Sequence, residues 1–219
     1  MKYFTKEMYE QMQVRGYFFY PETEQDLEED KAWYLENGRD FEEEAYQMFL
    51  LIKPYMLKYL SGPLQAAVED GSIMKTRLPA PDLAALIDEW KRSWDEEWER
   101  RCKDYRVNYE AIKPSLPMPV RGLKEKIRFH DAKLIRMTSS ADRRVEIVIQ
   151  ECFKEKETRL TFLEVNSLRC DADPVRSLCL YEEVYLLETG LFELCLLLES
   201  PETGLNEFSI VASGLDIHM

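Results

Sequence analysis

The sequence predicts an α+β protein, with a helical N-terminal region followed by an antiparallel β region. The prediction depends on a change in hydrophobic period near residue 127. Before this point apolar residues recur every three to four positions, as on one face of an amphipathic helix. After it apolar and polar residues alternate, as in a strand with one buried face. We therefore expect two regions, a helical one over 1–119 and a β one over 120–219 with about six strands.

Four to five helices are expected in the N-terminal region, separated by residues that interrupt or end helices. Thr5 can cap the first helix through its hydroxyl. Asn37-Gly38 would interrupt the long second stretch, and Pro54 would kink it. The PSLPMP segment at 114–119 cannot continue a helix and is the expected linker to the β region. The helical stretches run, in order, over residues 5–14, 22–60, 63–70 and 82–112.

A two-residue alternation of apolar and polar side chains marks the strands of the β region. Val145, Ile147 and Ile149 are expected on one face, because successive side chains of a strand point to opposite sides. The pattern returns around residue 160, over 192–198 and over 208–212. No helical pattern separates these segments. The expected sheet is thus an antiparallel meander or small sandwich, and a nucleotide-binding α/β sheet is not expected.

The chain carries a net charge of −13, and both expected regions are acidic. Residues 1–120 have a net charge of −8 and residues 121–219 a net charge of −5. Nonspecific binding to nucleic acid and adsorption to anionic membranes both depend on a surplus of Lys and Arg, so neither is expected. A basic protein partner fits the charge, although acidity also favours solubility. The oligomeric state stays open.

The cysteines and the apolar runs indicate the compartment. The longest apolar runs have the length of a strand, and the N-terminus lacks the apolar core of a signal peptide. The five cysteines form no CxxC pair and are expected to be reduced. These features predict a cytoplasmic protein.

No motif of a common catalytic or cofactor site is present. The sequence lacks GxxxxGK[ST], GxGxxG, GxSxG and HExxH. His130 and His218 are the only histidines, so a three-histidine zinc site is impossible. Neither a metal nor a cofactor is expected, and a non-enzymatic protein is favoured over an enzyme.

Five residues are candidates for a ligand or partner site: His130, Asp131, Trp90, Trp94 and Glu182. His130 and Asp131 begin the β region, where His130 either acts in binding or as a base, or hydrogen-bonds within an interface. Trp90 and Trp94 lie one helical turn apart and form either an aromatic groove or a buried seam. Glu182 interrupts an apolar strand, either at an exposed edge or at the mouth of a loop.

Three stretches resemble a known family: MKYFTKEMYEQMQ, EWKRSWDEEWERRCKDYRVNYEAIKPSLP and FHDAKLI. In this combination and order they are similar to an uncharacterised family of Gram-positive, mainly spore-forming bacteria, known only as a domain of unknown function. The resemblance implies a bacterial origin and a cytosolic setting, and it implies no catalytic residues. FHDAKLI followed by strands is also similar to β domains of small bacterial proteins, some of them toxin-immunity proteins.

Two functions are consistent with these patterns. The first is a non-enzymatic binding protein, immunity-like in one version, whose acidic surface attracts a basic partner. The alternative is a hydrolase with a site at the junction of the two halves, where His130 or Asp131 would act with carboxylates of the helices. A cleft with perturbed ionisable groups would favour the enzyme, and an exposed acidic or aromatic patch would favour binding.

Overall fold

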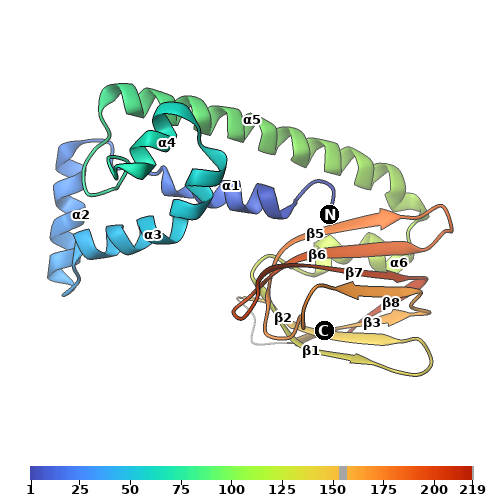
Figure 1. Cartoon of the computed structure of the whole chain (residues 1–219). Coiled ribbons are helices and arrows are strands. Elements are labelled where there is room, and N and C mark those ends of the chain that lie inside the picture. Colours follow the sequence, from blue (N-terminus) through green and yellow to red (C-terminus); the bar gives the residue numbers. More distant parts are fainter. Residues whose placement is uncertain (153–156, 219) are drawn as a thin grey trace. The chain divides into compact units, whose positions relative to one another are not determined.

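The computed structural model describes residues 1–152 and 157–218. Helices come first and an antiparallel sheet follows, which confirms the α+β class (Figure 1). By their contacts the residues form two compact units. The helical unit is Glu7–Arg100, and the β unit combines Met1–Lys6 with the chain from Arg101 onward. The division expected between residues 119 and 120 falls inside the β unit.

Five substantial helices supply the helical unit. The break expected at Asn37-Gly38 is present, because Asn37 caps the second helix and Gly38 adopts a φ of 68° that favours glycine. The third helix continues through Pro54. The helices are α1 (Lys6–Tyr17), α2 (Glu24–Glu36), α3 (Phe41–Tyr59), α4 (Gly62–Glu69) and α5 (Pro81–Ile112), of which α5 also contributes its last turns to the β unit.

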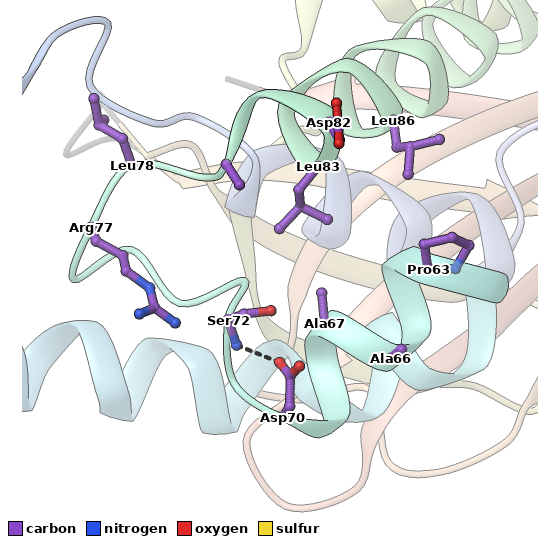
Figure 2. A pocket seen from close by; sticks show the side chains of 11 residues that line it. Pro63, Ala66, Ala67, Asp70, Ser72, Arg77, Leu78, Asp82, Leu83 and Leu86 are labelled. Atoms are coloured by element: carbon purple, nitrogen blue, oxygen red, sulfur yellow. Dashed lines mark hydrogen bonds between the residues drawn. The ribbon is translucent and has the colours of Figure 1, made fainter.

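Apolar side chains from α1, α3, α4 and α5 form the core of the helical unit. Phe49, Ile52 and Met56 recur at helical spacing along α3 and are at most 5% exposed. Helix α2 contributes far less, since Leu27 is its only buried residue. Between α4, the following loop and the first turns of α5 lies an open cavity of about 580 Å³ (Figure 2).

The β unit holds one antiparallel sheet of eight strands in the order β4-β7-β6-β5-β1-β2-β3-β8. The sequence predicted about six, and the two additional strands, β4 and β8, are too short to show a clear alternation. The strands are β1 (Ala132–Ser139), β2 (Val145–Gln150), β3 (Glu157–Leu163), β4 (Ser167–Cys170), β5 (Leu178–Leu186), β6 (Phe192–Ser200), β7 (Gly204–Ala212) and β8 (Gly214–His218).

The sheet curls back on itself around its core. Strand β4 pairs with β7 at one end of the strand order, and β3 pairs with β8 at the other. Only Ser213 separates β7, the second strand in the order, from β8, the last, so one nearly continuous strand runs close to both ends of the sheet. Inward side chains such as Leu194, Leu196 and Leu198 fill the enclosed space.

The segment expected as a linker packs into the core of the β unit. After Ile112 the chain forms a short 3₁₀ turn and two single-turn helices, α6 (Met118–Arg121) and α7 (Leu123–Lys126). Leu116, Val120 and Leu123 are at most 1% exposed within the core of the sheet. The prolines end α5, and Leu116, which lies between them, packs with Val120 and Leu123 in the core of the β unit.

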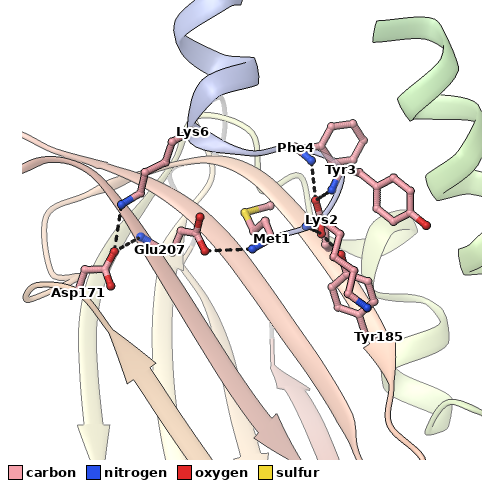
Figure 3. Close-up of polar contacts among 9 residues, drawn as sticks. Met1, Lys2, Tyr3, Phe4, Lys6, Asp171, Tyr185 and Glu207 are labelled. Atoms are coloured by element: carbon pink, nitrogen blue, oxygen red, sulfur yellow. Dashed lines mark hydrogen bonds and ion pairs between the residues drawn. The ribbon is translucent and has the colours of Figure 1, made fainter. Parts of the chain in front are cut away.

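The first residues of the chain lie against β5 and β7 (Figure 3). The Met1 ammonium lies 3.0 Å from Glu207 Oε2, and Lys6 Nζ lies 3.1 Å from Asp171 Oδ2. Between these two ion pairs, successive backbone amides donate to the carboxylate of Glu183. The N-terminal segment therefore belongs to the β unit, although the helical region begins directly after it.

Candidate functional site

The structure brings together three of the five candidate residues at one edge of β5. His130 Nδ1 lies 2.8 Å from the carbonyl oxygen of Leu180, and His130 Nε2 lies 3.6 Å from Asp131 Oδ2. Glu182 follows two positions after Leu180 on the same strand. A lysine that the sequence did not indicate, Lys124 of α7, places Nζ 3.7 Å from Glu182 Oε1.

A local break in strand pairing explains this cluster. Strand β5 pairs with β1 only through residues 178–179, and its register with β6 shifts between Cys179 and Tyr181. Such a bulge leaves backbone groups without partners in the ladder. Side chains make the hydrogen bonds that a neighbouring strand would make there. His130 bonds the carbonyl of Leu180, and the hydroxyl of Tyr105 accepts from Val184 N at 2.9 Å.

Burial affects both charges of the Lys124–Glu182 pair. Glu182 shares the core-facing side of β5 with Val184 and has a side chain only 24% exposed. This burial raises the pKa of the Glu182 carboxyl, while Lys124 opposes the rise. Burial also lowers the pKa of the Lys124 amine, whose Nζ lies 4.1 Å from the ring centre of Tyr105. Opposed shifts of this kind suit proton exchange, but they also arise in structural ion pairs.

On the opposite side of β5, Glu183 has a structural role. It is fully buried, and its carboxylate accepts from the amides of Lys2, Tyr3 and Phe4 at 2.9, 2.9 and 2.6 Å. The hydroxyl of Tyr185 donates to the same carboxylate. Four donors of the chain itself therefore occupy the carboxylate oxygens of Glu183. The residue anchors the N-terminal segment to the sheet.

Trp90 and Trp94 belong to the helical unit and pack against other aromatic rings there. Trp90 meets Phe18 edge-on, with ring centres 5.5 Å apart, and Trp94 stacks on Trp98 at 5.6 Å. Trp94 is only 8% exposed. These two candidates therefore lie in a different unit from His130, Asp131 and Glu182.

Net charge is distributed very unevenly between the two units. The helical unit carries 22 acidic and 10 basic residues, a net charge of −12. The rest of the chain carries 20 acidic and 19 basic residues, a net charge of −1. The sequence-based division at residue 120 hid this asymmetry, because it assigned basic residues of 1–6 and 101–120 to the helical side.

The most acidic part of the helical unit also exposes large apolar side chains. Between Glu22 and Glu44 there are 11 acidic residues against Lys31 and Arg39. Both cations already pair locally, Lys31 with Glu28 and Arg39 with Glu44. We call the exposed part of α2 and α3 the α2–α3 surface. Its large apolar members, each at least 42% exposed, are Trp33 and Leu35 within this acidic stretch and Tyr46, Met48, Leu50 and Leu51 directly after it on α3.

Within residues 1–152 and 157–218, no three His, Cys, Asp or Glu side chains are grouped so that they could hold a metal ion. Over the same residues, no helix is both long and apolar enough to cross a bilayer.

A family model described as "Protein of unknown function (DUF4085)" matches residues 3–212. The chain belongs to this family. The resemblance to a domain of unknown function is thereby confirmed, and the match includes the complete helical unit and every strand before β8. No curated protein and no solved structure matches the chain.

Proposed function

We propose that the protein is a non-enzymatic binding protein whose α2–α3 surface recognises a basic, amphipathic segment of another protein. The observation that carries this proposal is the coincidence of charge and apolar exposure. A net charge of −12 belongs to the unit that also exposes Trp33, Leu35 and Leu51 at 51%, 77% and 66%. Exposed apolar groups in a charged surround are typical of interaction surfaces.

Charge and apolar contact would contribute differently to binding. The acidic field of the helical unit would accelerate the encounter with a basic partner and disfavour acidic ones. Removing the exposed aromatic and leucine side chains from water would then supply affinity. An amphipathic helix with basic residues beside an apolar face satisfies both requirements.

The setting of this proposal is the bacterial cytoplasm, where free thiols persist. All five cysteines lie among the described residues and are free. In the immunity-like version the partner is a basic toxin, and binding of its basic segment neutralises it.

A synthetic helix with leucines on one face and lysines on the other provides the test. We expect it to bind the full chain, with an affinity that falls as salt shortens the Debye length from about 30 Å at 0.01 M to about 8 Å at 0.15 M. An otherwise identical peptide with glutamate in place of lysine should not bind. Titration calorimetry or anisotropy of a labelled peptide measures both.

Two double variants distinguish the contribution of the α2–α3 surface from that of the net charge of the whole helical unit. Glu36→Lys with Glu42→Lys changes this surface, whereas Glu69→Lys with Glu89→Lys makes the same charge change on α4 and α5. The proposal expects the first pair to weaken binding clearly more than the second. Equal losses from both pairs, or binding that ignores Leu35→Ser with Leu51→Ser, would contradict it.

The Lys124–Glu182 pair beside His130 supports hydrolysis as a second candidate function. In that proposal Glu182 exchanges a proton with the substrate, and the Lys124 ammonium stabilises the negative charge that develops on the substrate. A panel of nitrophenyl esters and phosphates tests the proposal on the full chain. Turnover that is lost in both Glu182→Gln and His130→Ala, but retained in Glu146→Gln, would support it. Activity that survives Glu182→Gln would refute it.

A further inference from the structure

The cavity of the helical unit has an apolar floor between two helices. Pro63, Ala66 and Ala67 of α4 face Leu83 and Leu86 of α5 across it (Figure 2). Its volume of about 580 Å³ falls within the range of small-molecule sites, about 300–1,000 Å³. The alanines matter here, because larger side chains at the same positions would occupy this space.

Two carboxylates lie on opposite sides of that floor. Figure 2 shows Asp70 at the end of α4 and Asp82 at the start of α5, with Ala67 and Leu83 between them. Hydrogen bonds from the side chain and the backbone amide of Ser72 lower the pKa of Asp70. The distance from Ser72 N to Asp70 Oδ1 is 2.7 Å. Asp70 is therefore held as an anion.

Asp82 differs from Asp70 because its carboxylate has no partner in the part of the chain that the structure describes. Its carboxylate makes no hydrogen bond or ion pair with any residue that the structure describes, although it lines the cavity. An ionised carboxylate at the rim of an apolar cavity gains from a cation that can reach both it and the floor.

One cation, Arg77, also lines the cavity, so an anionic ligand must be considered. Arg77 is exposed, as are Asp70 and Asp82, and its charge helps to lower the pKa of Asp70, so part of that charge is already offset by Asp70. The two rim carboxylates and the net charge of −12 of the whole unit outweigh this one positive charge. The summed potential disfavours an anion and favours a cation.

We propose that this cavity binds a small apolar molecule that carries an ammonium group. The apolar body lies on the alanine and leucine floor, and the ammonium reaches Asp82 at the rim, while Asp70 on the opposite side keeps its bonds from Ser72. The site is separate from the α2–α3 surface, so it stands whether or not that surface binds a protein partner.

Three probes with one apolar body and different end groups test the proposal: phenylbutylamine, phenylbutanol and phenylbutyrate. We expect the amine to bind the full chain about fivefold tighter than the alcohol, the size of a favourable exposed charge pair, and the carboxylate to bind weakest. Chemical shift changes in a nitrogen-labelled sample give both the affinity and the location.

Variants at the floor and rim complete the experiment. Ala66→Phe fills the cavity from an exposed helix position and should abolish binding, whereas Ala85→Phe, the same change at an exposed α5 position outside the lining, should not. Asp82→Asn should reduce the preference for the amine and leave the alcohol unaffected. The proposal is overturned if no probe binds, if the carboxylate equals or exceeds the amine, or if Ala66→Phe binds like the parent chain.

Discussion

Glu183 shows how a single residue joins segments that are distant in sequence. Its carboxylate is fully buried, yet three amides and a tyrosine hydroxyl donate to it. A buried charge without such donors would be very costly, and donors that lose a buried acceptor are costly as well. The residue therefore stabilises the N-terminal segment and β5 together.

Replacing Glu183 by alanine should destabilise the β unit by about 3 kcal/mol, because the amides of Lys2, Tyr3 and Phe4 would lose their acceptor. Urea unfolding followed by the amide NMR signals of strand residues measures the loss. Glu207→Gln is the control, since the Glu207 side chain is 41% exposed and makes a single ion pair, and it should cost less than about 1 kcal/mol. Similar losses in both variants would show that the buried anchor is unimportant.

Lys75 is the second residue whose environment leads to a prediction. Burial lowers its pKa from 10.5 to about 8, and its Nζ lies 5.0 Å from the ring centre of Tyr17. Between pH 8 and 10.5 the unfolded chain therefore binds more protons than the folded one at this residue. Its contribution to the free energy of unfolding rises with pH across that window and is unfavourable below it.

Lys75→Met should consequently stabilise the helical unit at pH 7, by about 1–2 kcal/mol after allowance for solvent near the amine. The advantage over the parent chain should shrink as the pH rises from 8 to 10.5. Tryptophan fluorescence during urea unfolding reports on this unit, because all four tryptophans lie within it. A destabilised variant at pH 7 would mean that the contact with the tyrosine rings outweighs the cost of burial.

Among the elements, α2 depends most on its own cap. It buries only Leu27, and Thr23 forms a capping box in which Thr23 Oγ1 accepts from Asp26 N at 3.1 Å while Asp26 accepts from Thr23 N at 2.9 Å. Helices of this length are marginal without tertiary packing, so the box decides how firmly α2 is formed.

Thr23→Ala should destabilise α2 by about 1 kcal/mol and speed amide hydrogen exchange in α2 roughly fivefold. Exchange followed by mass spectrometry or NMR resolves the effect by helix. Ser61→Ala offers a comparison, because Ser61 precedes α4 without a side-chain capping bond and its loss should change α4 little. If the α2 amides of Thr23→Ala exchanged at the rate of the parent chain, the stability of α2 would have to come from contacts other than the capping box.

At the scale of the whole molecule, the uneven charge distribution predicts a different response of each unit to salt. Self-repulsion destabilises a compact unit with a net charge of −12, whereas a unit with −1 is nearly indifferent. Raising the salt concentration from about 0.01 to 0.15 M shortens the Debye length about fourfold and weakens that repulsion.

We therefore expect the urea midpoint followed by tryptophan fluorescence to rise with salt. The midpoint followed by the amide NMR signals of the strands should change much less. Sodium chloride is suitable, since sulfate would also strengthen apolar burial in both units. A parallel rise in both midpoints would show that the units unfold together or that repulsion is unimportant.

Local patterns in the sequence were enough to determine the fold class and most elements. The change of period near residue 127, the break at Asn37-Gly38 and the proline stop after α5 involve neighbouring residues only. Hydrophobic period and turn chemistry are local properties, so they can be read without coordinates. The same patterns marked His130, Asp131 and Glu182 as unusual, but they did not mark Lys124 as their neighbour.

Only the tertiary structure decided which residues meet and where the charge is concentrated. The Lys124–Glu182 pair and the bonds of residues 2–4 to Glu183 join positions at least 58 residues apart in the chain. The bulge in β5 and the assignment of residues 1–6 and 101–112 to the β unit likewise depend on strand pairing and packing. Such contacts depend on the complete fold, because residues distant in the chain have no local pattern that specifies their separation in space.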